Sequence, residues 1–239
     1  MDGRMRAGMT ATLAIVTAAA VTPGVSAQAP SPAPGLLGAT TEVFSDDLSG
    51  PSVWEEISDD TGITVHEDGR LAMSVIADGS TVWDDHELEA PVDVLRVEAL
   101  VATTCDGMAG VACGSSLGVP RFLWAGTDGE SGWLVGRLID GRLQLIDRGD
   151  LPRGVDGGRV TLAIECASSP ADGGDHAVVT ADGVPVATLF DIPVGPYDKA
   201  TLLVGADAAP EEALFDDVVV HTGTTYIAPV GDLLASPTP

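Results

Sequence analysis

Short runs of alternating apolar and polar residues, separated by turn signals, fill most of this chain. The clearest run lies between Pro91 and Cys105, where one face carries Leu95, Val97, Ala99 and Val101 and the other carries Arg96 and Glu98. No stretch of about 12 residues shows a helical period. About a dozen such runs predict an all-β chain, a two-sheet antiparallel β-sandwich of the jelly-roll kind.

Three Asp-Gly pairs mark the tightest turns, at residues 68–69, 140–141 and 182–183. Each pair lies between two alternating runs, and this arrangement is the strongest short-range signal for a β-hairpin. We therefore predict three two-residue hairpins at these positions.

The hairpin around Asp140 and Gly141 predicts which side chains share a face. A two-residue turn pairs Ile139 with Arg142 and Arg137 with Gln144. The apolar side, which we assign to the core, carries Leu134, Gly136, Leu138, Leu143 and Leu145. The opposite side carries Trp133, Arg137, Arg142 and Gln144, which combine an aromatic ring with planar hydrogen-bonding groups suited to sugar rings. This side is a candidate ligand-binding face, with an ordinary solvated outer sheet as the alternative.

The chain ends lack this pattern. Arg4 and Arg6 precede an apolar, Ala-rich run that ends in small residues, which predicts a secretory signal peptide over residues 1–27. An uncleaved membrane anchor is the alternative, although the run is short for a membrane span. A Pro- and Ala-rich spacer follows over residues 28–40. The sandwich is expected over residues 41–222, with a C-terminal tail over residues 223–239.

The amino-acid composition limits the kinds of molecule that the protein can bind. The formal net charge is −25 and the pI is near 4.1. Such an excess of carboxylates repels nucleic acid phosphates and anionic lipid surfaces, so we expect no nucleic acid partner and no membrane insertion. Three cysteines, at 105, 113 and 166, in an exported chain make one disulfide plausible and leave three pairings open. No spacing typical of a zinc site is present.

Several sequence blocks resemble one family when they are taken in order. They are "VFSDDLSGPSVW", "AGVACG", "RVTLAIEC", "HAVVTADGVPVATLFD" and "GPYDKATLLVGADAAPEEALFDDVVV". Together they resemble the bacterial extracellular concanavalin A-like (LamG-like) jelly-roll domains. The resemblance implies a two-sheet jelly roll and a disulfide between Cys113 and Cys166. Cys105 is extra to the family pattern and offers a competing pairing with Cys113.

Catalysis on this fold would require a pair of carboxyl groups. Glucanases of the fold carry Glu-x-Asp-x-(x)-Glu along one strand, and that string is absent here. Glu87 and Glu89 have strand spacing, but Pro91 follows, so a solvated strand edge is the favoured interpretation. We therefore expect a secreted, non-catalytic module that acts in cell-envelope or extracellular interaction, with either a glycan or another extracellular protein as partner. A glycoside hydrolase-type enzyme on the same fold is the alternative.

The run "ALFDDVVVHTG" places two carboxylates at the start of an apolar strand. Strict alternation would put Asp216 on one face with Val218, and Asp217 on the other. Related carbohydrate-binding jelly rolls hold a structural calcium between this strand and the opening strand. That resemblance predicts a Ca²⁺ held by Asp216 with Asp46 or Asp47, since hard cations prefer oxygen ligands. The alternatives are acids that cap strand ends, and catalysis.

Overall fold

The computed structural model describes residues 37–50, 52–103, 107–116, 121–139, 142–168, 175–190 and 195–224. These residues form fourteen β-strands and no helix, so the predicted all-β class is confirmed. Accordingly, none of them belongs to a helix that could cross a membrane. The predicted signal peptide, most of the spacer, Cys105 and most of the tail lie outside the described residues.

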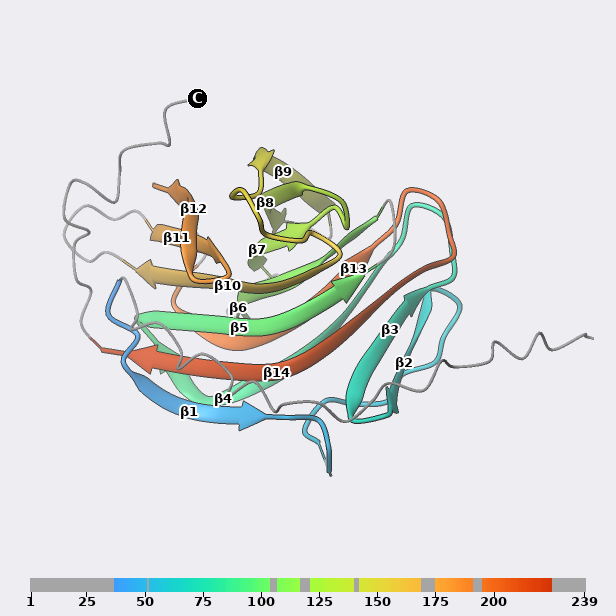
Figure 1. Cartoon of the computed structure of the whole chain (residues 1–239). Coiled ribbons are helices and arrows are strands. Elements are labelled where there is room, and N and C mark those ends of the chain that lie inside the picture. The colour runs from blue at the N-terminus through green and yellow to red at the C-terminus, as the bar shows by residue number, and fades with distance from the viewer. Residues whose placement is uncertain are drawn as a thin grey trace, which may run out of the picture. The chain divides into compact units, whose positions relative to one another are not determined.

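The first sheet has eight antiparallel strands, in the order β12-β11-β10-β5-β14-β3-β2, with β1 also paired to β14. Figure 1 shows β5, β14 and β1 as long neighbouring strands. The strands of this sheet are β1 (Thr41–Asp46), β2 (Gly62–Glu67), β3 (Arg70–Val75), β5 (Val94–Thr103), β10 (Arg159–Ser168), β11 (Asp175–Ala181), β12 (Val184–Leu189) and β14 (Glu211–Gly223).

The second sheet has six antiparallel strands, in the order β4-β13-β6-β7-β8-β9. They are β4 (Thr81–Val92), β13 (Tyr197–Gly205), β6 (Met108–Ser115), β7 (Arg121–Thr127), β8 (Gly132–Ile139) and β9 (Arg142–Asp150). One hydrophobic core contains side chains from both sheets, including Val97 and Ile164 of the first and Val111 and Leu202 of the second. The two-sheet sandwich is therefore as predicted.

Two of the predicted Asp-Gly hairpins are seen directly. Asp68 and Gly69 join β2 to β3 with φ angles of 50° and 73°, and Asp182 and Gly183 join β11 to β12 with 48° and 76°. A turn with positive φ at both central residues matches the right-handed twist of the flanking strands, and aspartate and glycine tolerate that conformation. The third pair, Asp140 and Gly141, lies outside the described residues. Its flanking strands have the predicted register, with Arg137 opposite Gln144.

The disulfide joins the two sheets. Cys113 lies on β6 and Cys166 on β10, with their Cα atoms 6.5 Å apart, and both side chains are fully buried. The pairing implied by the family resemblance is thus the one that the structure contains.

Strand β14 contains a β-bulge at the two aspartates. Asp216 pairs with Leu100 of β5 and Val219 pairs with Glu98, so the two residues between them oppose a single residue of β5. Asp217 adopts a φ of 48°, in the left-handed region. The extra residue resets the alternation, because Phe215 and Val218 are both fully buried in the core between the sheets. The predicted strict alternation of Asp216 with Val218 is therefore wrong.

The outer face of the eight-stranded sheet is covered in part by the segment before β1. Leu37 and Ala39 are buried there, and the carboxylate of Glu165 accepts hydrogen bonds from both backbone N–H groups at 2.9 Å. Arg96 lies beside Glu165 on this face, only 1% exposed. The last residues of the predicted spacer therefore pack against the sandwich, and the polar side of β5 is buried at Arg96.

Candidate functional site

The outer face of the six-stranded sheet forms a groove of about 1080 Å³. The strand register builds this face in rows, each with one residue from every strand. One row consists of Asp85, Thr201, Ala112, Trp124, Gly136 and Leu145. The next row on one side consists of Trp83, Leu203, Gly110, Gly126, Leu134 and Arg148. We call this face, with its lining residues, the groove.

Glycine residues on the central strands make room for neighbouring side chains in the floor of the groove. Gly136 leaves space for the indole of Trp124, because a Cβ at that position would collide with the ring. The Trp124 side chain is only 3% exposed, and its indole N–H has no hydrogen-bond partner among the described residues. Trp83 on edge strand β4 is 43% exposed. The groove therefore presents an exposed aromatic ring beside a buried, unpaired hydrogen-bond donor.

The predicted ligand-binding face is wrong for Trp133. This residue touches one end of the groove, but it is 8% exposed and packs with Val135 in the core between the sheets. The side assigned to the core instead faces the groove through Leu134, Leu138 and Leu143. Both sides of β8 are apolar, so the turn fixed which residues pair but not which side is buried.

The other predicted ligand residues do not join the groove. The Nε of Arg137 donates a 3.0 Å hydrogen bond to Oε1 of Gln144, which satisfies the pairing expected from the turn. The side chain of Arg142 lies outside the described residues. A binding role for Arg137, Arg142 and Gln144 stays a prediction.

Charged side chains lie at the β4 edge of the groove. Lys199 on β13 approaches Asp85 at 3.4 Å and Glu87 at 3.2 Å, and Thr201 donates a 2.7 Å hydrogen bond to Asp85. Burial alone would lower the pKa of Lys199, but the two carboxylates outweigh it and raise that pKa. One ammonium group thus holds two carboxylates near each other.

Sequence reasoning paired Glu87 with Glu89 and missed Asp85. The three acids nevertheless alternate along one stretch of the sequence, as Asp85, Glu87 and Glu89. In the structure β4 is irregular beyond Glu87, because Tyr197 pairs with Val92 whereas Lys199 pairs with Glu87. Asp85 and Glu87 are therefore neighbours on one face of the regular part of β4.

The three predicted calcium ligands have protein partners. Asp46 accepts hydrogen bonds from the Leu48 N–H at 2.8 Å and the Ser52 hydroxyl at 2.6 Å. Asp47 caps Ser49 in the same loop. No three His, Cys, Asp or Glu side chains in the described ranges are grouped closely enough to hold a metal ion.

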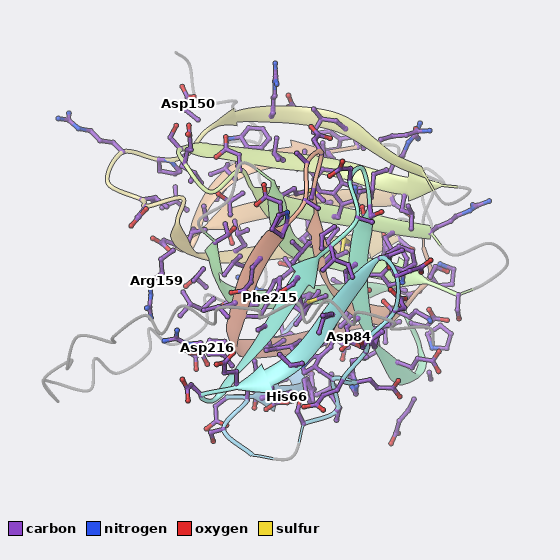
Figure 2. The ribbon with its side chains drawn as sticks, turned by 90° about the vertical axis from the view of Figure 1, so that its right-hand side faces the viewer. His66, Asp84, Asp150, Arg159, Phe215 and Asp216 are labelled. Carbon is purple, nitrogen blue, oxygen red and sulfur yellow. A yellow bond between two sulfur atoms is a disulfide. The ribbon has the colours of Figure 1, made fainter. Side chains whose placement is uncertain are left out.

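Asp216 is the third of these ligands, and its nearest cation is Arg70, 3.6 Å away. Burial and the charge of Asp217 raise the pKa of Asp216. Figure 2 shows Arg159 on the same side of the molecule. These partners suit the strand-end alternative, and the calcium site stays a prediction that thermal melts with calcium and with chelator can test.

Asp84 is a buried acid on the other side of β4. It is 4% exposed, and one carboxylate oxygen has no partner among the described residues. Figure 2 shows Asp84 in the same part of the view as His66. Burial raises the pKa of Asp84 to about 6, with Asp85 and Glu55 adding to the effect and backbone N–H groups opposing it.

Replacing Asp84 with asparagine is expected to flatten the pH dependence of stability. A folded-state pKa near 6, above the unfolded value of 3.8, contributes stability that is present below the unfolded value and lost as pH rises through about 6. Asparagine cannot ionise, so Asp84→Asn should lose less stability than the wild type between about pH 5 and about pH 7.5. Urea unfolding at both pH values measures this. Equal losses in the two proteins would contradict the assignment.

Comparison with known proteins places the fold. No protein-family model and no curated protein matches the chain. An endo-1,3-β-glucanase from Streptomyces sioyaensis aligns with a TM-score of 0.55 at 14% identity, covering 81% of this chain and 99% of that one. A β-1,3-1,4-glucanase (lichenase) from a mouse hindgut metagenome aligns with a TM-score of 0.54 at 13% identity, covering 77% and 99%.

A protein of unknown function with a galectin-like fold from Bacillus subtilis also aligns, with a TM-score of 0.54 at 13% identity, covering 79% of this chain and 99% of that one. These likenesses show that the chain has the concanavalin A-like jelly-roll fold. Most of the solved structures that align with this chain at a similar TM-score are glycoside hydrolases.

The groove floor has its own chemistry. Strands β6, β7 and β8 form the floor of the groove, and none of their described residues on this face is an acid. The floor residues are Met108, Gly110, Ala112, Gly114, Phe122, Trp124, Gly126, Gly132, Leu134, Gly136 and Leu138. Carboxylates occur instead at β4 and at the opposite end of the groove.

Proposed function

We propose that the protein acts on a glycan chain that lies in the groove of the six-stranded sheet. The observation that carries the proposal is the pair of tryptophans on this face, Trp83 exposed and Trp124 buried with an unpaired indole N–H. A sugar ring offers an apolar face for the exposed indole and hydroxyl oxygens for the buried donor. The glycan-active neighbours of the same fold support this proposal.

The compartment is part of the proposal. A disulfide that crosses the core is typical of proteins that fold in an oxidising environment. Together with the predicted signal peptide, the disulfide supports export of the protein to the extracellular space, where polymeric glycans are accessible. An interaction domain without sugar specificity is the rival, and it would bind no glycan in the groove.

Replacing Trp83 with alanine is expected to weaken glycan binding about tenfold or more, because the variant loses the apolar platform for the ring. Affinity electrophoresis of the mature protein against a panel of soluble glycans identifies the ligand, and calorimetry measures the loss. Phe190→Ala is the matched control, since Phe190 is 45% exposed and contacts His176 of the other sheet. Unchanged affinity in Trp83→Ala, or an equal loss in Phe190→Ala, would contradict the proposal.

Hydrolysis in the groove is the second candidate function, favoured by the names of the neighbours. Asp85 and Glu87 are its candidate carboxyl pair. Each lies within 3.4 Å of the Lys199 ammonium, so their oxygens can be separated by no more than the sum of the two distances, which is compatible with the spacing in glycosidases of about 5–9.5 Å. The ammonium favours ionised carboxylates, whereas a general acid must carry a proton.

The two candidates differ in one measurement. A hydrolase releases new reducing ends from the bound glycan, and Asp85→Asn or Glu87→Gln would stop the release while the glycan remains bound. If the wild-type protein binds a glycan and releases no reducing ends, the groove binds without hydrolysis.

A further inference from the structure

The groove carries an excess of negative charge. At the end formed by β9 and the segments after β7 and β13 lie three acids and one arginine, namely Asp128, Asp150, Asp207 and Arg148. At the β4 edge lie two acids and one lysine, namely Asp85, Glu87 and Lys199. The carboxylates on this face thus outnumber its cations at both ends.

Two of these acids have free carboxylates. Asp128 is committed to its own loop, where it accepts hydrogen bonds from the N–H groups of Glu130 and Gly132 at 3.0 and 2.8 Å. The side chains of Asp150 and Asp207 are exposed and have no hydrogen-bond or ion-pair partner among the described residues. Figure 2 shows Asp150 at the top of the view. These two acids are available to a ligand.

The tryptophans of the groove point to the same kind of ligand. The exposed indole of Trp83 can stack on a sugar and also attract a cation to its face. The buried N–H of Trp124 requires an acceptor, which a sugar hydroxyl or ring oxygen supplies. A ligand with sugar rings and positive charges would satisfy both the aromatic and the acidic parts of this face.

We propose, building on the glycan function above, that the groove prefers an amino-sugar chain with free, protonated amines over the N-acetylated, neutral or acidic chains. Asp150 and Asp207 attract the ammonium groups, while the exposed ring of Trp83 contacts a sugar ring. Uronic acid chains are repelled by the same carboxylates. Charges act over about 8 Å at physiological ionic strength, and both acids line the same groove as the tryptophans.

The test compares oligomers of one length and one linkage that differ only in the amino group. Binding of glucosamine, N-acetylglucosamine and uronic acid oligomers to the mature protein is measured by calorimetry at low and high salt, below the pKa of the amine. The free-amine chain should bind about tenfold more tightly than the N-acetylated chain at low salt, and the ratio should fall as salt is added. The uronic acid chain should bind most weakly.

A matched pair of variants locates the preference. Asp150→Asn/Asp207→Asn should lower the affinity ratio of amine to N-acetyl chains severalfold. Glu42→Gln/Glu67→Gln removes the same charge from exposed positions on strands β1 and β2 of the other sheet and should keep the wild-type ratio. An equal drop in both variants would show a general charge effect and overturn the assignment to the groove.

The outcomes separate this inference from the proposed function. Binding of the N-acetylated chain with no preference for the amine overturns the inference and leaves the glycan function standing. Binding of no sugar chain at all overturns both. A lysine oligomer that binds as tightly as the glucosamine chain, with the same loss in Asp150→Asn/Asp207→Asn, would identify a cationic peptide site and overturn the amino-sugar assignment.

Discussion

Replacing both Cys113 and Cys166 with alanine is expected to lower the free energy of unfolding by about 4 kcal/mol. The two residues are separated by 53 positions, and cross-linking a loop of that size restricts the unfolded chain by about this amount in the loop-entropy model. The bond also joins β6 to β10, so it holds the two sheets together. Urea unfolding of the oxidised wild type and of the double variant measures the difference.

The third cysteine supplies the control. Cys105→Ala should keep the stability of the wild type, and peptide mapping without reductant should still join Cys113 to Cys166. A bridge from Cys105 to either partner, or a double variant as stable as the wild type, would contradict the assignment.

Replacing Arg96 with methionine is expected to cost about 3–5 kcal/mol of stability, because it removes the guanidinium that lies beside a buried carboxylate. Arg96 donates to Glu98 at 2.6 Å and lies 3.9 Å from the fully buried carboxylate of Glu165. Methionine preserves much of the packing volume, so the loss reports mainly on charge. Denaturant unfolding measures it.

Two further variants test whether the loss of stability in Arg96→Met comes from the buried charge. Arg70→Met removes the cation of a more exposed pair with Asp216 and should cost less than about 1 kcal/mol. Adding Glu165→Gln to Arg96→Met should recover part of the loss, since the buried negative charge is then removed as well. An Arg96→Met variant no less stable than Arg70→Met would show that the buried pair contributes little.

The sequence predicted features that depend on neighbouring residues. A two-residue turn with positive φ at both positions favours Asp-Gly, so this pair predicted the turn at Asp68. The Asp-Gly pair at 140–141 likewise predicted that Arg137 lies opposite Gln144. Clean alternation likewise placed Leu95 and Val97 in the core. The cysteine pairing came from the family resemblance, because spacing alone left three choices.

Features that depend on distant residues were missed. Trp133 was assigned to the wrong face because β8 is apolar on both sides, and only the opposing sheet decides which side is buried. Arg96 alternates as a solvated residue would, but Glu165 and the segment at Leu37 cover it. The groove itself arises from six strands, and no local pattern identifies Trp83 and Trp124 as members of one surface.

The bulge at Asp216 and Asp217 lets β14 carry one residue more than its partner without turning its later side chains over. Val218 and Val220 face the core because the bulge absorbs that extra residue. Deletion of Asp217 would leave Phe215 and Val218 two positions apart, so simple alternation would keep both valines inward. Over evolutionary time this stretch can therefore lose one residue, whereas a residue 217 that keeps its positive φ is favoured as aspartate, asparagine or glycine.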